Sequence, residues 1–129
     1  MKIYVFGNPL VPEDSKLLEY LPELKKKFPK INFEIVDPNE NFPPFGVKDL
    51  VIIDTVQGID KVQMIEFSDL KSIDSTPVSP HDYDLLFHLL LLKKLGKINT
   101  VKIIGLPQKN YIELDEVFKL ISNIFVSNH

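Results

Sequence analysis

Residues 50–53 form an uninterrupted apolar run, Leu-Val-Ile-Ile, and this run limits the possible folds more than any other feature of the chain. Strands that are apolar at every position are typical of parallel sheets covered by helices on both faces. The preceding segments agree with this interpretation. A short apolar run at residues 3–6, a helical pattern at 15–28 and an alternating pattern at 31–35 make a βαβ unit. The sequence therefore predicts an α/β fold.

Two more strands and two more helices complete the pattern, at residues 61–67, 79–95, 101–104 and 113–125. The first of these segments follows residues 50–53 after a connection too short for a crossover, so we expect the two to pair as an antiparallel hairpin. In the first of the two helices, Ser79 is the expected N-cap and Gly96 the expected end. The prediction is a single domain over residues 1–129. Its fold is a three-layer sandwich with a mixed, mostly parallel five-stranded sheet flanked by helices.

The composition excludes several classes of function. A net charge of −3 argues against nucleic acid or an anionic membrane surface as the main partner. The absence of cysteine excludes disulfides, cysteine nucleophiles and thiolate metal sites, and it agrees with the reducing cytoplasm that we expect as the location. No run of 18 apolar residues occurs, so we expect no insertion into a membrane.

The loops predicted at the carboxyl ends of the parallel strands contain possible metal ligands. In open α/β sheets, binding sites lie in the crevice beyond these ends. The three loops supply Glu13 or Asp14, Asp54, and His81. Two carboxylates and an imidazole suit zinc, nickel, iron or manganese and are poorly matched to Cu(I). The sequence therefore offers a candidate metal site at this edge of the sheet.

Each candidate ligand also has a simpler structural interpretation. Asp14 is a possible cap of the first helix, and Asp54 a possible turn residue after its strand. His81 lies in the first turn of the predicted helix 79–95, where a surface histidine is the simplest interpretation. The helix dipole disfavours imidazolium at that position, which keeps the ring in the neutral form that binds metals.

Four motifs follow one another along the chain: Gly7-Asn8-Pro9-Leu10 with Glu13-Asp14, Val51-Ile52-Ile53-Asp54 with Gly58, Ser79-Pro80-His81-Asp82, and Val101-Lys102-Ile103-Ile104-Gly105-Leu106-Pro107. They look like the pattern G-N-x-L-x-x-D-[DE], an apolar strand ending in Asp with a following Gly, the pattern S-x-H, and a final strand ending in G-[IL]-x-P. Together and in this order they resemble the hydrogenase maturation protease family. These endopeptidases trim the C-terminus of nickel–iron hydrogenase large subunits.

The resemblance implies a phosphorylase/hydrolase-like fold, with a mixed five-stranded sheet flanked by helices, and a triad of Asp14, Asp54 and His81. In such a protein the triad is catalytic and engages the nickel carried by the hydrogenase large-subunit precursor, the expected partner, with zinc or cadmium expected to substitute in vitro. The supporting loop residues implied in this way are Gly7, Asn8, Glu13 and Gly58. Cleavage of one peptide bond then releases a short C-terminal peptide, with either a metal-bound water or a carboxylate base providing the nucleophile.

Two alternatives remain open. The family commonly has Gly-x-Gly soon after the acidic pair, where this chain has Ser15-Lys16-Leu17, so the first alternative is a non-proteolytic, metal-binding accessory protein for hydrogenase assembly. The second is a receiver-like signalling module, because Asp54 follows the third strand of a small α/β domain. A receiver needs an acidic pair directly after the first strand and a lysine after the last strand. Gly7-Asn8 and Gly105-Leu106 stand there, so the receiver is the weaker alternative.

Overall fold

The computed structural model describes residues 2–6, 12–36, 42–56, 59–66, 83–107 and 111–126. Strands and helices alternate along this part of the chain, with the bounds β1 (Lys2–Phe6), α1 (Pro12–Lys27), β2 (Asn32–Val36), β3 (Asp49–Val56), β4 (Gln63–Glu66), α2 (Tyr83–Lys94), β5 (Thr100–Pro107) and α3 (Leu114–Val126). The strands form one five-stranded sheet in the order β2-β1-β3-β5-β4, in which only β4 is antiparallel to its neighbour.

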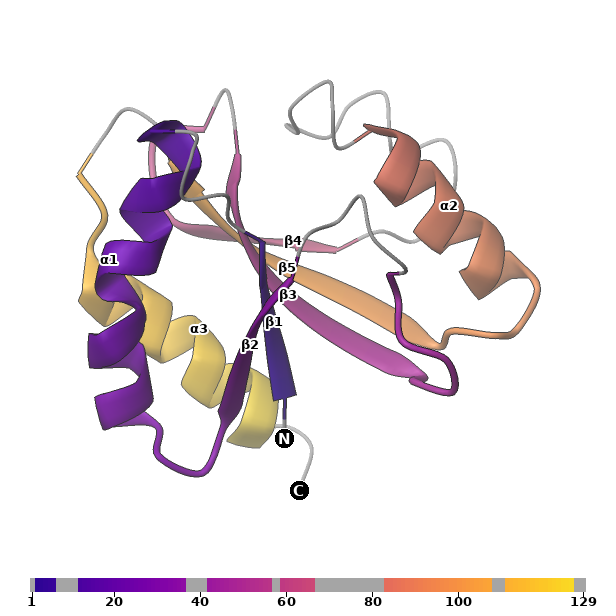
Figure 1. Ribbon diagram of the computed structural model, residues 1–129, viewed down its shortest axis with the longest axis horizontal. Coiled ribbons are helices and arrows are strands. Elements are labelled where there is room, and N and C mark those ends of the chain that lie inside the picture. The colour runs from indigo at the N-terminus through magenta and orange to yellow at the C-terminus, as the bar shows by residue number, and fades with distance from the viewer. Residues whose placement is uncertain are drawn as a thin grey trace.

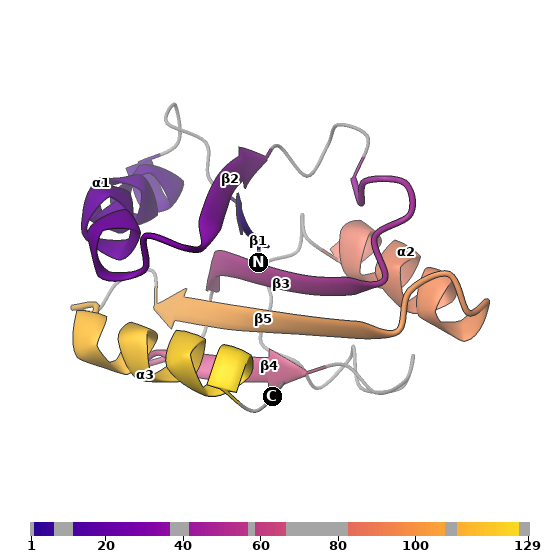
Figure 2. The same cartoon turned by 90° about the horizontal axis from the view of Figure 1, so that it is seen from below.

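Helices cover both faces of the sheet. Helices α1 and α3 lie on one face and α2 lies on the other, as Figure 1 and the view from below in Figure 2 both show. This arrangement confirms the predicted α/β three-layer sandwich with a mixed, mostly parallel sheet. No helix in the described ranges is both long and apolar enough to cross a membrane.

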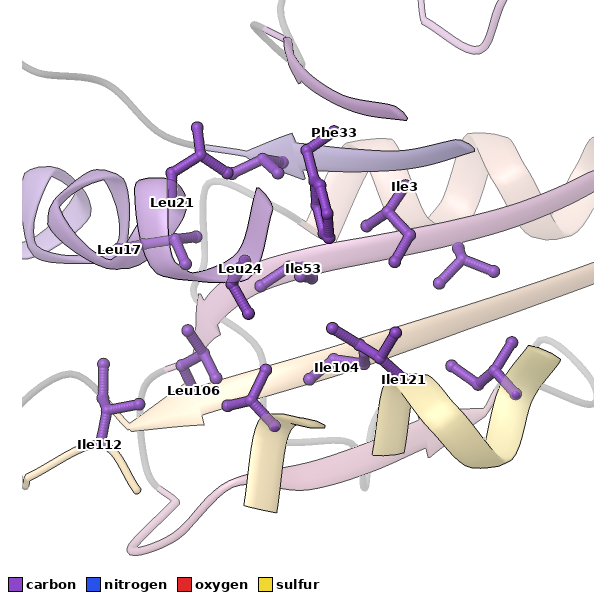
Figure 3. Close-up of a cluster of buried hydrophobic side chains, with 14 residues drawn as sticks. Ile3, Leu17, Leu21, Leu24, Phe33, Ile53, Ile104, Leu106, Ile112 and Ile121 are labelled. Carbon is purple, nitrogen blue, oxygen red and sulfur yellow. The ribbon is translucent and has the colours of Figure 1, made fainter. Parts of the chain in front are cut away.

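The first half of the core fills the space between the sheet and helices α1 and α3 (Figure 3). Helix α1 contributes Leu17, Leu21 and Leu24, whose spacing of four and three residues keeps them on one side of the helix. From the sheet, Ile53 and Ile104 point toward this layer and are fully buried. Helix α3 contributes Val117, Ile121 and Ile124, which are buried and lie on one side of the helix.

The second half of the core lies on the α2 face. Leu89 and Leu90 of α2 are buried there, over residues of β1, β3, β4 and β5. Phe42, which follows β2, completes the cover: its ring meets those of Tyr4 and Phe6 edge-on, with centroids 5.3 and 5.2 Å apart. Among the described residues, one face of the sheet therefore carries two helices, and the other carries one helix and the irregular segment that contains Phe42.

Gly96 closes helix α2 just after its last residue, Lys94, as the sequence predicts. Gly96 has a φ of 76°, a left-handed backbone conformation that residues with a Cβ atom rarely adopt. The amide of Gly96 donates to the carbonyl of Lys93, and the amide of Lys97 to that of Leu92, at 3.1 and 2.9 Å. This is the Schellman arrangement, which satisfies carbonyl groups that the end of a helix leaves unpaired. The predicted N-cap, Ser79, lies outside the described residues.

The prediction that the third and fourth strands form a hairpin is wrong. Strand β4 pairs with β5 in the antiparallel direction, and β5 lies between β3 and β4. Both sides of β3 are occupied, because β1 and β5 pair with it in parallel. The connection after β3 is long enough to reach beyond β5, and the apolar β3 gains more burial in the centre of the sheet than at an edge.

Three element boundaries also differ from those expected. Strand β3 continues through Asp54 to Val56, and β5 continues through Gly105 to Pro107, because the two strands pair along their full lengths. Helix α1 begins at Pro12 rather than near residue 15. Proline suits the first helical position because its missing N–H has no partner within the helix there.

Burial of Tyr4 generates a prediction about stability at high pH. Burial raises the pKa of the Tyr4 phenol, nearby Lys2 lowers it by a smaller amount, and Glu34 raises it further. Above pH ~10 an unfolded tyrosine ionises while the folded Tyr4 keeps its proton. The free energy of unfolding should therefore fall as the pH rises from that value through the pKa of folded Tyr4.

We expect the Tyr4→Phe variant to lose this part of the alkaline destabilisation in urea titrations between pH 8 and 11.5. The matched control is Tyr111→Phe, which removes the hydroxyl of a tyrosine that is 77% exposed rather than buried. Identical pH profiles for wild type and Tyr4→Phe would contradict the prediction.

Candidate functional site

One edge of the sheet collects the carboxyl ends of four strands. Strands β1, β2, β3 and β5 are parallel, so their last residues lie toward the same edge, which we call the carboxyl edge. Helix α1 follows β1 and begins near this edge. A short connection joins the end of α2 to the opposite edge, where β5 starts, so α2 also begins toward the carboxyl edge (Figure 1). This is the location at which binding sites of open α/β sheets are found.

Asp54 lies on β3, two residues before the strand ends at the carboxyl edge. Side chains alternate along a strand, and both Ile52 and Val56 belong to the core cluster on the α2 face. Asp54 therefore projects toward the α2 face, where it is half-buried. Its register partner on β5 is Gly105. The interpretation of Asp54 as a turn residue is wrong, because the strand ladder fixes its backbone.

The neighbours of Asp54 are mostly apolar. Tyr4 and Val5 of β1 pair with Ile52 and Ile53, so Phe6 is the next residue of β1 beside Asp54. Phe6 is only 4% exposed. A carboxylate at the rim of such a cluster has fewer water contacts than a surface carboxylate, so it gains more from a cation or a hydrogen-bond donor. Asp54 is therefore suited to binding chemistry rather than to a purely solvated role.

The position of Gly105 next to Asp54 was not recognised from the sequence, which placed it at the end of its strand. A Cβ atom at Gly105 would lie 3.1 Å from Ile65, 3.2 Å from Val56 and 3.3 Å from Ile59. The missing side chain therefore lets the segment that leads from β3 to β4 pack closely over β5. A glycine inside an otherwise apolar strand is the sequence signal for such a close approach.

Thr55 is a second residue that the sequence analysis missed. It was expected in a loop, but it lies in β3 and is 2% exposed on the face covered by α1 and α3. Within the described ranges it is the one buried polar residue. The alternation of side chains along β3 could have predicted this burial, because Thr55 lies on the same face of the strand as the buried Val51 and Ile53.

Asp14 lies in the first turn of α1, and the helix begins before it, at Pro12. It is therefore part of the helix rather than the cap residue that precedes it. Helix α1 covers the face of the sheet opposite to the one that Asp54 faces. The structure thus brings Asp14 and Asp54 to the carboxyl edge from elements on two different layers. Glu13 occupies the same first turn.

The remaining predicted site residues, Gly7, Asn8, Gly58 and His81, lie outside the described residues. His81 precedes the first described residue of α2, Tyr83, by two positions. Among the residues that the structure describes, no group of three or more His, Cys, Asp or Glu side chains is arranged to hold a metal ion. The described part of the chain thus provides Asp54 and the first turn of α1, and the triad remains a prediction.

Comparison of the chain with protein-family models, with curated proteins and with solved structures found no match. Any function is therefore inferred from the residues of this chain and their positions in the fold.

The close packing over Gly105 predicts that a larger side chain at this position destabilises the protein. The Gly105→Val variant forces Ile59, Val56 and Ile65 apart, and overpacking of this kind costs roughly 1–3 kcal/mol of the free energy of unfolding. Lys102→Val places the same side chain on the opposite face of β5, at a half-exposed position, and serves as the control. Urea denaturation measures both, and a Gly105→Val variant as stable as wild type would contradict the packing described here.

Proposed function

We propose that the protein is a cytoplasmic endopeptidase that removes the C-terminal extension of a nickel-loaded hydrogenase large-subunit precursor. In this proposal Asp14, Asp54 and His81 recognise the nickel that the precursor carries. The observation that supports it best is the position of Asp54, a half-buried carboxylate on β3 at the carboxyl edge. Asp14 lies in the first turn of α1 near the same edge, and the segment with His81 leads into α2, which begins toward it.

The fold also supports the proposal. The resemblance to hydrogenase maturation proteases implies a mixed five-stranded sheet flanked by helices, and the chain has this architecture. A fold is shared by many unrelated functions, so the four motifs and the ligand chemistry have to provide the specificity. All four motifs belong to segments at or next to the ends of β1, β3 and β5 and the start of α2.

The proposed ligand set suits a nickel ion held by the substrate. Two carboxylates and a neutral imidazole provide oxygen and nitrogen donors for a borderline divalent metal. Only a precursor already loaded with nickel would present the ion at the carboxyl edge, so binding would select the correct substrate. Hydrolysis then adds water across one peptide bond, which leaves a new carboxyl terminus on the large subunit and frees the amine of the released peptide.

A second candidate, the non-proteolytic accessory protein, is favoured by one observation. The family's Gly-x-Gly corresponds here to Ser15-Lys16-Leu17, and these residues lie inside the continuous helix α1. Leu17 is fully buried in the core beneath that helix. At the positions where the family has glycines, this chain has residues of a regular helix. A helix is more rigid than a glycine-containing loop, so this difference suits a rigid surface that binds the precursor. The two candidates differ in one result, namely whether the precursor becomes shorter.

The proposed ligand set predicts the effect of single substitutions on nickel binding. Asp14→Ala, Asp54→Ala and His81→Ala should each fold, as thermal unfolding would show, and each should weaken Ni²⁺ binding at least about 10-fold in calorimetric titrations. Asp49→Ala is the matched control, because Asp49 lies on the same strand at the opposite edge and accepts a hydrogen bond from Thr100 at 2.7 Å. If all three variants bind Ni²⁺ as tightly as wild type, the triad is wrong.

The proposed activity predicts the masses of hydrogenase large subunits in cells with and without this gene. Deletion should cause a C-terminally extended subunit to accumulate, and wild-type protein, but not the His81→Ala variant, should restore the trimmed form. Intact-protein mass spectrometry distinguishes the two forms. Correctly trimmed subunits in the deletion strain would contradict the protease and favour the accessory role.

A further inference from the structure

Helix α2 is apolar on more sides than the sheet can cover. Residues 85–92 read Leu-Leu-Phe-His-Leu-Leu-Leu-Leu, and a helix that is apolar all round is normally buried on all sides. Leu89 and Leu90 are buried on the sheet. Phe87, Leu91 and Leu95 remain 41, 38 and 70% exposed. We call these last three residues the α2 stripe.

The α2 stripe has the geometry of a helix-packing ridge. Its members follow one another at intervals of four residues, and such rows of side chains interdigitate when two helices pack. Helix α2 is also the outermost described element on its face of the sheet, at the right of Figures 1 and 2. Within the described part of the chain, the approach of another helix to α2 is therefore open.

We propose that the α2 stripe binds the α2 stripe of a second copy of this chain, with the two helices antiparallel. The stripe is self-complementary about a two-fold axis through its middle residue, Leu91. In that arrangement Leu91 meets Leu91 of the second copy, and Phe87 meets Leu95 of the second copy. A two-fold interface requires such pairing of one patch with itself.

The charges of α2 favour a second copy in this orientation. Asp84 is in the first turn of the helix, whereas the exposed Lys94 is in its last turn and the exposed Lys97 follows. Antiparallel pairing brings the acidic beginning of each helix to the basic end of the other, and it opposes the two helix dipoles. Parallel pairing would instead place the lysines of both copies side by side. The charges and the α2 stripe therefore favour the same arrangement, the antiparallel dimer.

The dimer is independent of the proposed function. The α2 stripe lies on the outer side of the helix, whereas Asp54 belongs to the sheet beneath the α2 face. Pairing through the stripe therefore leaves the carboxyl edge accessible. A protein without any nickel or protease chemistry would form the same dimer.

The first test is the mass of the protein in solution by sedimentation equilibrium at concentrations from about 1 to 200 µM. Wild type should approach the mass of two chains, and Leu91→Lys should raise the dissociation constant at least about 30-fold, the loss expected for a central anchoring side chain. The matched control is Tyr111→Lys, which changes another exposed residue outside the stripe and should leave the dimer intact. Circular dichroism verifies that each variant is folded. A wild-type monomer throughout this range, or an undiminished Leu91→Lys dimer, would overturn the proposal.

The second test determines orientation and uses the absence of cysteine from the chain. Under mild oxidation, Leu91→Cys should give a disulfide-linked dimer, because this position lies at the two-fold axis. Leu95→Cys alone should not, because the two copies of that position lie roughly 12 Å apart along antiparallel helices, beyond the reach of a disulfide. A mixture of Phe87→Cys and Leu95→Cys chains should cross-link to each other. Efficient cross-linking of Leu95→Cys to itself would overturn the antiparallel arrangement.

Discussion

The pairing of β3 with β5 is the interaction on which the other features of the structure depend. The two strands match from Asp49 and Thr100 to Val56 and Pro107, in the centre of the sheet. Hydrogen bonds hold the beginning of this ladder, from the Thr100 hydroxyl to Asp49 and from the Asn99 amide to the carbonyl of Lys48, both at 2.7 Å. With β5 in this place, β4 can pair only on its far side.

The same ladder determines where Asp54 lies. Continuous pairing extends β3 beyond its purely apolar part, so a carboxylate follows Ile52 on the α2 face close to the edge of the sheet. Its partner, Gly105, has no side chain, and apolar residues from the segment around β4 pack closely over that position. The half-buried environment of Asp54 is thus a consequence of strand pairing and of one glycine. Neither depends on the identity of a ligand.

In the described part of the chain, different elements cover the two faces of the sheet, and this difference has consequences for binding. Helices α1 and α3 bury one face together, while the other face has α2 and the segment with Phe42. On the second face, the aromatic contacts of Phe42 cover β1, and α2 covers the strands beyond it. A single helix cannot shield its own outer side, so the α2 stripe stays exposed. Asp54 and the proposed dimer surface therefore belong to the same side of the sheet, the side on which α2 lies.

Local patterns in the sequence were sufficient to predict the helices and strands. They were not sufficient to predict which strands, distant from one another in the sequence, would pair. Hydrophobic periodicity located every strand and helix now described, and Gly96 marked the end of α2 correctly. The prediction of a hairpin was wrong because a short connection was taken to mean that the two strands are neighbours. In the structure β5, which is remote in sequence, lies beside β3. The predicted strand ends at Asp54 and Gly105 were wrong for the same reason. The pairing of β3 with β5 overrides the tendency of these residues to break strands.

For the candidate site, the sequence located Asp54 at the correct edge of the sheet. The sequence analysis did not predict the half-buried position of Asp54 within a strand, the close packing over Gly105 or the burial of Thr55. All three depend on contacts between segments that are distant in the sequence. The convergence of Asp14, Asp54 and His81 on one ion is the central claim that follows. A crystal structure of the protein with Ni²⁺ tests it most directly. We predict an ion held by both carboxylates and the imidazole at roughly 2.0–2.2 Å. An ion bound elsewhere on the protein, or ligand atoms too far apart to share one, would contradict it.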